Sequence, residues 1–108
     1  MTVTKLCETC SLKAISIADG EREVNGAYCC DLLSWVMGKA SEGNAWITIM
    51  SNINVIAVAE LTDVSCVILA EGVSLDDDAL NTAKQKGINV LSSNESAYTL
   101  CVMLGKTI

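Results

Sequence analysis

Residues 45–61, AWITIMSNINVIAVAEL, join two apolar runs through a short polar segment. The first run, AWITIM (45–50), predicts a buried strand, because branched and aromatic side chains fit a pleated surface. Ser51 or Asn52 is suited to cap a helix formed by NVIAVAEL, although the β-branched residues there also suit a strand. We favour the helix, since a polar pair precedes it and a further apolar run, SCVILA (65–70), follows it.

The same alternation of strands and helices extends outward from this unit in both directions. Further strands are expected over 13–18, 24–30 and 88–92. Further helices are expected from Thr4 to about residue 11, over 31–39 with Asp31 as the cap, and from Ser93 or Asn94 through Leu104 with Ala97, Leu100, Cys101 and Leu104 inward. This order predicts one α/β domain over residues 1–108, with a mostly parallel sheet of about five strands.

Segment 74–87 carries the clearest helix signals in the chain. Ser74 and Asp77 have the spacing of a capping box, and the acidic run 76–78 suits the positive end of a helix. Two lysines lie near the other end, and Gly87 is placed to end the helix in a left-handed conformation. The acidic run is therefore interpreted as helix-end charge rather than as a catalytic or metal site.

Composition excludes several classes of partner. The 108 residues are 51% hydrophobic and 19% charged, with a net charge of −6 and only seven scattered basic residues. Without a basic stripe, nucleic acid is not expected as a partner. The uncharged stretch 44–59 is too polar and too short to span a membrane, and no signal peptide is recognisable. We expect a cytoplasmic protein.

Six cysteines and no histidine limit the chemistry of the chain. CETC (7–10) has redox or metal spacing, but the second such motif that a zinc or iron–sulfur site would need is missing. Cys29 and Cys30 are adjacent, so in a strand they point to opposite faces. We interpret the cysteines as packing residues and expect no cofactor, no metal and no catalytic residue, with a CETC redox or metal protein as the minority alternative.

Polar residues follow several predicted strands. Ligands of open α/β sheets bind outside the carboxyl ends of the strands, where helix N-termini offer free N–H groups to anions. Asp31, Asn52 and Asn54 fit either this role or simple helix capping, and the pattern leaves both open. Arg22, the only arginine, is either a solvated turn residue or a contact for an anion.

Three segments together resemble the DRTGG domain family, most closely its small stand-alone bacterial members. They are REVNGAYCCDLLSWVMG (22–38), AWITIMSNINVIAVAEL (45–61) and GINVL (87–91), the last after a helix with an acidic start. The resemblance covers nearly the whole chain. Of the namesake motif, Arg22 and Gly26 are the residues that match.

The resemblance implies a three-layer fold like the N-terminal domains of bacterial HPr kinase and of the Mur ligases. The chain lacks a phosphate-binding loop, so the kinase reaction is not expected. What the family implies is a non-catalytic regulatory or ligand-sensing domain, acting as a homodimer and serving a client enzyme. Its ligand would be a nucleotide or other small anion, bound around Arg22, Gly26, Tyr28, Asp31, Thr48, Asn52 and Asn54.

A pure interaction module without a small ligand is the alternative. The mean hydropathy of +0.41 is high for so short a chain, which leaves apolar surface for a partner.

Overall fold

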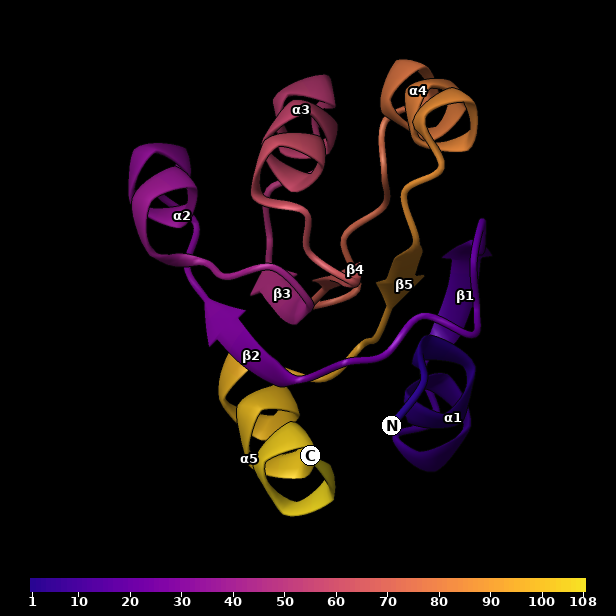
Figure 1. Ribbon diagram of the computed structural model, residues 1–108, viewed down its shortest axis with the longest axis vertical. Coiled ribbons are helices and arrows are strands. Elements are labelled where there is room, and N and C mark those ends of the chain that lie inside the picture. The colour runs from indigo at the N-terminus through magenta and orange to yellow at the C-terminus, as the bar shows by residue number, and fades with distance from the viewer.

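The computed structural model describes residues 1–108 as five helices and five strands (Figure 1). In chain order they are α1 (Val3–Thr9), β1 (Lys13–Ser16), β2 (Gly26–Cys29), α2 (Leu33–Lys39), β3 (Asn44–Thr48), α3 (Ile53–Thr62), β4 (Cys66–Leu69), α4 (Asp77–Lys86), β5 (Val90–Ser92) and α5 (Ala97–Thr107). No helix combines the length and the apolar character that crossing a lipid bilayer demands.

The strands form one sheet in the order β1-β5-β4-β3-β2. Strands β2, β3, β4 and β5 run parallel, and β1 pairs with β5 antiparallel. Helices α2, α3 and α4 cover one face, and α1 and α5 cover the other, so the sheet is the middle of three layers (Figure 1). The predicted α/β fold with a mostly parallel sheet of five strands is confirmed.

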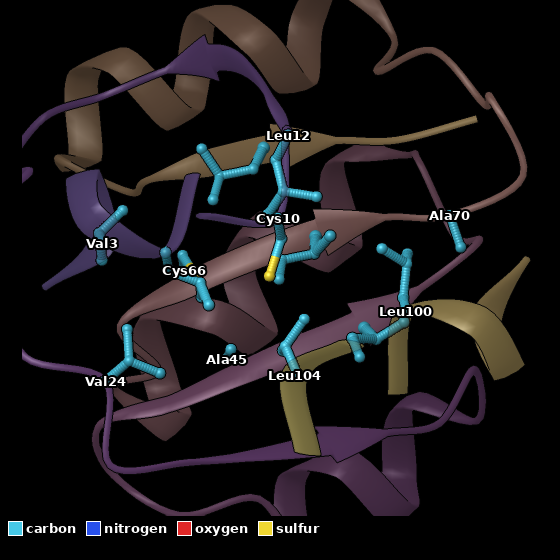
Figure 2. Close-up of a cluster of buried hydrophobic side chains, with 13 residues drawn as sticks. Val3, Cys10, Leu12, Val24, Ala45, Cys66, Ala70, Leu100 and Leu104 are labelled. Carbon is cyan, nitrogen blue, oxygen red and sulfur yellow. The ribbon is translucent and has the colours of Figure 1, made fainter. Parts of the chain in front are cut away.

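Successive side chains of the central strands belong alternately to two separate hydrophobic cores, one on each face of the sheet. Ala45 and Ile47 of β3 point toward α1 and α5, whereas Trp46 between them points toward α2 and α3. Strand β4 is buried on both faces, with Cys66 and Ile68 on the first side. Figure 2 shows the core on the α1–α5 side. A strand covered on both faces reads as a continuous apolar run, which is how 45–50 and 65–70 appear in the sequence.

The ambiguous segment after β3 is a helix, as predicted. Asn52 is its N-cap, and its side-chain oxygen accepts a hydrogen bond from the backbone N–H of Asn54 at 2.9 Å. The helix ends at Asp63, which adopts a left-handed conformation with φ 56°. Gly87 ends α4 in the same conformation, at φ 71°, as the sequence predicted.

Four helix starts differ from the predictions. The cap of α1 is Thr2 rather than Thr4, and the cap of α5 is Ser96 rather than Ser93 or Asn94. Helix α2 starts after Leu32 without any side-chain cap, so Asp31 is not its cap. Helix α4 starts after Asp76, whose side chain makes no capping hydrogen bond, so the Ser74–Asp77 capping box is absent. Local sequence offers several polar residues at each start, and the turn geometry selects among them.

Along α5 the inward face is narrower than predicted. Leu100 and Leu104 are buried and Ala97 is half-buried, but Cys101 is exposed. The expectation that Cys101 packs inward is therefore wrong. Its side chain lies on the flank of α5 that faces β2.

Buried Asn89 ties three loops together at the amino ends of the parallel strands. Its side-chain oxygen accepts hydrogen bonds from the backbone N–H groups of Ala18 and Asp19 at 2.8 and 2.9 Å. Its amide nitrogen donates to the carbonyls of Asp19 and Ser65 at 2.8 and 2.9 Å. All four bonding positions of one buried amide are thus used to position backbone, which fixes this edge of the sheet.

Candidate functional site

The seven residues predicted to bind a ligand do not share one place. Gly26 pairs with Asn44 at the starts of β2 and β3, whereas Thr48 ends β3 at the opposite edge of the sheet. Arg22 lies with Gly26 at the amino edge. Asp31 lies with Thr48 at the carboxyl edge. The expectation that Arg22 and Gly26 join the others at one loop edge is therefore wrong.

Arg22 is held by the end of α3. Its guanidinium donates from Nη1 to the Asp63 carboxylate at 2.9 Å and from Nη2 to the Asp63 carbonyl at 2.6 Å. The Arg22 side chain is about one-third exposed. These bonds place a cation at the negative end of a helix and satisfy one of its last carbonyls.

At the carboxyl edge, Asp31 bridges the ends of β2 and β3. Its Oδ1 accepts hydrogen bonds from the Thr48 hydroxyl at 2.8 Å and from the backbone N–H of Ile49 at 2.9 Å. The Thr48 hydroxyl in turn accepts from the N–H of Met50 at 3.1 Å. We call Asp31, Thr48, Asn52 and Asn54 the Asp31 cluster. No cation pairs with the Asp31 carboxylate, so the cluster carries a net negative charge.

Tyr28 lies apart from that cluster. It is half-buried in the middle of β2 and packs against the core on the α2–α3 side. The predicted set thus contains one group at the carboxyl edge, one pair at the amino edge and one residue within the strand.

The structure reveals a different cavity at the carboxyl edge, which we call the Lys13 cavity. It measures about 320 Å³ and lies between β1, the end of β5, the β4–α4 loop and α4. Its lining combines polar and apolar side chains and comprises Lys13, Ile15, Gly72, Val73, Ser74, Leu75, Leu80, Ser92 and Asn94. Its volume and its mixed lining are typical of small-ligand sites.

Charge distinguishes the Lys13 cavity from the Asp31 cluster. Lys13 is the one ionisable residue of the cavity lining, and two serine hydroxyls and an amide accompany it. A neighbouring hollow of about 470 Å³ shares Lys13, Ser92 and Asn94 but also contains Glu95. An ammonium group with hydroxyl and amide donors around it suits a phosphate or carboxylate.

The loop that walls the Lys13 cavity has an unusual backbone. Glu71 and Gly72 both have positive φ, at 61° and 71°. The N–H of Glu71 donates to the Glu95 carbonyl at 2.8 Å, and the N–H of Gly72 donates to the Ser93 carbonyl at 2.9 Å. A Cβ at Gly72 would lie 2.9 Å from Oδ1 of Asn94, so the loop approaches the end of β5 too closely for a side chain there.

A second concave feature lies beside the free edge of β2. This β2–α5 groove measures about 480 Å³ and is lined by Asn25, Gly26, Ala27, Tyr28, Cys29, Ile47, Cys101, Leu104, Gly105 and Ile108. It contains no charged side chain. Within it, the pKa of the Cys29 thiol is raised to about 11, first by burial and then by contact with Cys101 and by the negative charge of Asp31.

The CETC cysteines bond within the fold. Cys7 donates from its thiol to the Leu12 carbonyl at 3.1 Å, and Cys10 is buried in the core on the α1–α5 side. Burial and the neighbouring Glu8 raise the pKa of the Cys7 thiol, which is the opposite of what a reactive thiol needs. No three histidine, cysteine or acidic side chains are grouped as metal ligands.

Sequence reasoning missed Lys13, Ser92 and Asn94. They are ordinary polar residues: Lys13 begins β1, Ser92 ends β5 and Asn94 follows β5. They come together because β1 runs antiparallel to β5. The one available signal was their position at predicted strand ends, which Ser74 shares. Strand order was not predictable, so that signal pointed to many combinations.

The fold is similar to a solved regulatory structure, the CBS and DRTGG domains of the regulatory region of Clostridium perfringens pyrophosphatase, crystallised with the activator diadenosine tetraphosphate. The TM-score is 0.77, the sequences are 17% identical, and the similarity covers 99% of this chain. It covers 47% of the neighbour, so this chain spans about half of that length. No protein-family model matches the sequence, and the comparison with curated proteins also gave no match. At this identity the similarity shows the fold, which is DRTGG-like.

Proposed function

We propose that this chain is a non-catalytic regulatory domain that binds a small anionic ligand and passes the binding signal to a client enzyme. Nucleotides are the first ligand class to test. The observation that carries this proposal is the fold, which matches over 99% of the chain a regulatory region solved with a nucleotide activator.

Electrostatics favours the Lys13 cavity as the place of binding. A phosphate brought to the Asp31 cluster meets a carboxylate that has no cation partner, which opposes binding. A phosphate brought to the Lys13 cavity meets an ammonium group, two hydroxyls and an amide. The apolar side chains that also line the cavity suit the flat face of a base. The Asp31 cluster is kept as the alternative location.

The backbone of the β4–α4 loop adds support for the Lys13 cavity. Glu71 is a non-glycine residue with φ 61°, a conformation that costs energy and is concentrated at functional sites. Its hydrogen bond to Glu95 couples the cavity wall to the loop before α5. The effect of a ligand that contacts this loop can therefore be transmitted to α5 on the other face of the sheet.

A thermal-shift panel of mono-, di- and triphosphate nucleotides, with inorganic phosphate as a reference, tests the proposal. A ligand at 100 times its Kd stabilises the folded state by about 2.7 kcal/mol, which is a measurable shift. We expect at least one nucleotide to raise the midpoint, and Lys13→Ala to reduce that shift. The matched control is Lys84→Ala, which removes an exposed lysine from α4 outside the cavity lining. No shift across the panel contradicts the nucleotide proposal.

A homodimeric interaction module is the second candidate, and an exposed apolar surface favours it. Leu32, Trp35 and Met37, at and along α2, are each more than half exposed, at 56%, 55% and 53%. The ammonium group of Lys39 lies 5.0 Å from the centre of the Trp35 ring and covers part of it. Apolar side chains gathered on one helix are typical of contact surfaces.

Light scattering over a range of concentrations tests this candidate. We expect a dimer that Trp35→Ala weakens. The control is Tyr98→Ala, which removes an aromatic side chain that is 78% exposed on α5, on the other side of the sheet. A monomer at micromolar concentration contradicts the homodimer.

A further inference from the structure

Two exposed thiols from distant parts of the sequence meet in the β2–α5 groove. Cys29 is the last residue of β2, and Cys101 lies in the first half of α5. Both line the groove, and α5 lies directly beneath β2 (Figure 1). The Cys101 side chain is close enough to the Cys29 thiol to raise its pKa further, after burial as the first cause. Two cysteines separated widely along the chain are thus brought into one groove.

The other four cysteines are placed differently. Cys10 and Cys66 are buried in the core. The Cys7 thiol donates to the Leu12 carbonyl, and Cys30 packs against the core on the opposite face of the sheet from Cys29. Among the six, Cys29 and Cys101 are the two that are exposed. The fold thus presents one accessible dithiol.

We propose that Cys29 and Cys101 form a thiol–disulfide site, oxidised reversibly by low-molecular-weight disulfides of the glutathione class. The inference is independent of the ligand proposed for the Lys13 cavity, which lies at the other end of the sheet beyond β3, β4 and β5. It also differs from a CETC redox site, since the thiols involved come from β2 and α5.

The two thiols have distinct parts in the reaction. Cys29 stays protonated at neutral pH because the pKa of its thiol is raised to about 11, so Cys101 is the attacking group. The Cys101 thiolate attacks one sulfur of the oxidant RSSR, forms a mixed disulfide and releases RS⁻. Cys29 then transfers its proton to that RS⁻ and attacks the Cys101 sulfur. This expels the second RS⁻, which takes up from solvent the proton that Cys101 released when it became a thiolate. The protein loses two electrons and two protons, and the oxidant leaves as two RSH.

The bond would link the edge strand to the helix that covers it. β2 is one of the two edge strands of the sheet. It pairs only with β3, and its other side is free. A link to α5 would hold this edge against the helix and close the middle of the groove. Oxidation is therefore expected to raise the midpoint of thermal unfolding, since a link across so long a loop constrains the unfolded chain.

Intact-mass analysis of the folded protein tests the site. The protein is incubated with glutathione disulfide, quenched with acid, and measured without reductant. We expect a monomer lighter by two hydrogens, a peptide map that joins Cys29 to Cys101, and recovery of the original mass with dithiothreitol. Cys29→Ser is expected to stop at the glutathione mixed disulfide on Cys101.

Two further variants serve as controls. Cys7→Ser/Cys10→Ser removes the CETC pair, and it is expected to oxidise like the unmodified protein. Cys101→Ser changes an exposed side chain and should fold normally, as circular dichroism checks. A link that maps to other cysteines, a mass loss that survives in Cys29→Ser, or oxidation that needs denaturant overturns the proposal.

Discussion

Lys13, the first residue of β1, lies opposite Ser92, the last residue of β5, in the antiparallel pairing of these two strands. The pairing brings a lysine from the start of the chain to the carboxyl edge of the parallel strands, where ligands of open α/β sheets bind. The antiparallel direction of β1 thus brings Lys13 beside Ser92 in the lining of the Lys13 cavity.

The wall of this cavity depends on Gly72. Gly72→Ala is expected to destabilise the fold by about 1–3 kcal/mol, because the new Cβ adds strain at positive φ and meets Oδ1 of Asn94 at 2.9 Å. Gly38→Ala is the control, since Gly38 lies in α2 at ordinary φ and an added Cβ would meet no neighbouring side chain or distant backbone within 4 Å. The free energy of unfolding is expected to rise there by about 0.5–1 kcal/mol. Urea unfolding measures both. Equal effects of the two variants would contradict the account of the loop.

Asn89 is expected to be among the most sensitive polar positions. Asn89→Ala leaves two N–H groups and two carbonyls without their partner, and a loss of about 2–4 kcal/mol is expected. Asn81→Ala, on the exposed side of α4, should change the free energy of unfolding by no more than about 0.5 kcal/mol. If Asn89→Ala is as mild as Asn81→Ala, the amide does not anchor the amino edge.

The Asp31–Thr48 hydrogen bond is expected to be structural. A double-mutant cycle with Asp31→Ala and Thr48→Val should give an interaction energy of about 1 kcal/mol in urea unfolding, since the two side chains bond directly at 2.8 Å. Neither single variant should weaken a ligand held in the Lys13 cavity. Additive effects on stability would show that the pair is uncoupled.

Alkaline pH is expected to weaken the fold partly through Cys66. Burial raises the pKa of this thiol to about 12, whereas an unfolded thiol has a pKa of about 8.5. Between these values the unfolded chain has released a proton that the folded chain keeps. The free energy of unfolding therefore falls as pH rises, by up to about 1.4 kcal/mol for each pH unit from this group, and the effect is absent below about pH 8.

Urea unfolding at pH 8 and pH 10, with reductant present, checks this slope. Cys66→Ala should show a smaller loss between the two pH values than the unmodified protein. Val67→Ala removes core volume from the same strand without removing a thiol, so its pH slope should stay unchanged. An unchanged slope in Cys66→Ala would refute the assignment.

Much of the fold could be predicted because its signals are local. The runs 45–50 and 65–70 are apolar on both faces because helices cover both faces of β3 and β4. Asn52 was one of two predicted caps, since a short polar side chain before an apolar run suits a helix start. The same local rule failed at Asp31, whose carboxylate bonds across to the end of β3 instead of capping α2.

The candidate site could be predicted only in part, because it depends on strand order. Asp31 and Thr48 were expected together and are together, since consecutive parallel strands end side by side. Arg22 was expected with them and instead pairs with Asp63 at the amino edge. Lys13 lies beside Ser92 only because β1 runs antiparallel to β5. That direction is determined by packing between segments that are distant in the sequence. No local sequence pattern indicates the direction of β1.

We propose above all that a small anionic ligand binds in the Lys13 cavity. Titration of the ¹⁵N-labelled protein with the nucleotide that gives the largest thermal shift, followed through its amide NMR signals, tests this most directly. The largest changes are expected on the amides of Lys13, Gly72–Leu75 and Ser92–Asn94. Lys13→Ala is expected to reduce the affinity at least tenfold, which is about 1.4 kcal/mol. Changes centred on Asp31, Asn52 and Asn54, or no saturable change at all, would contradict it.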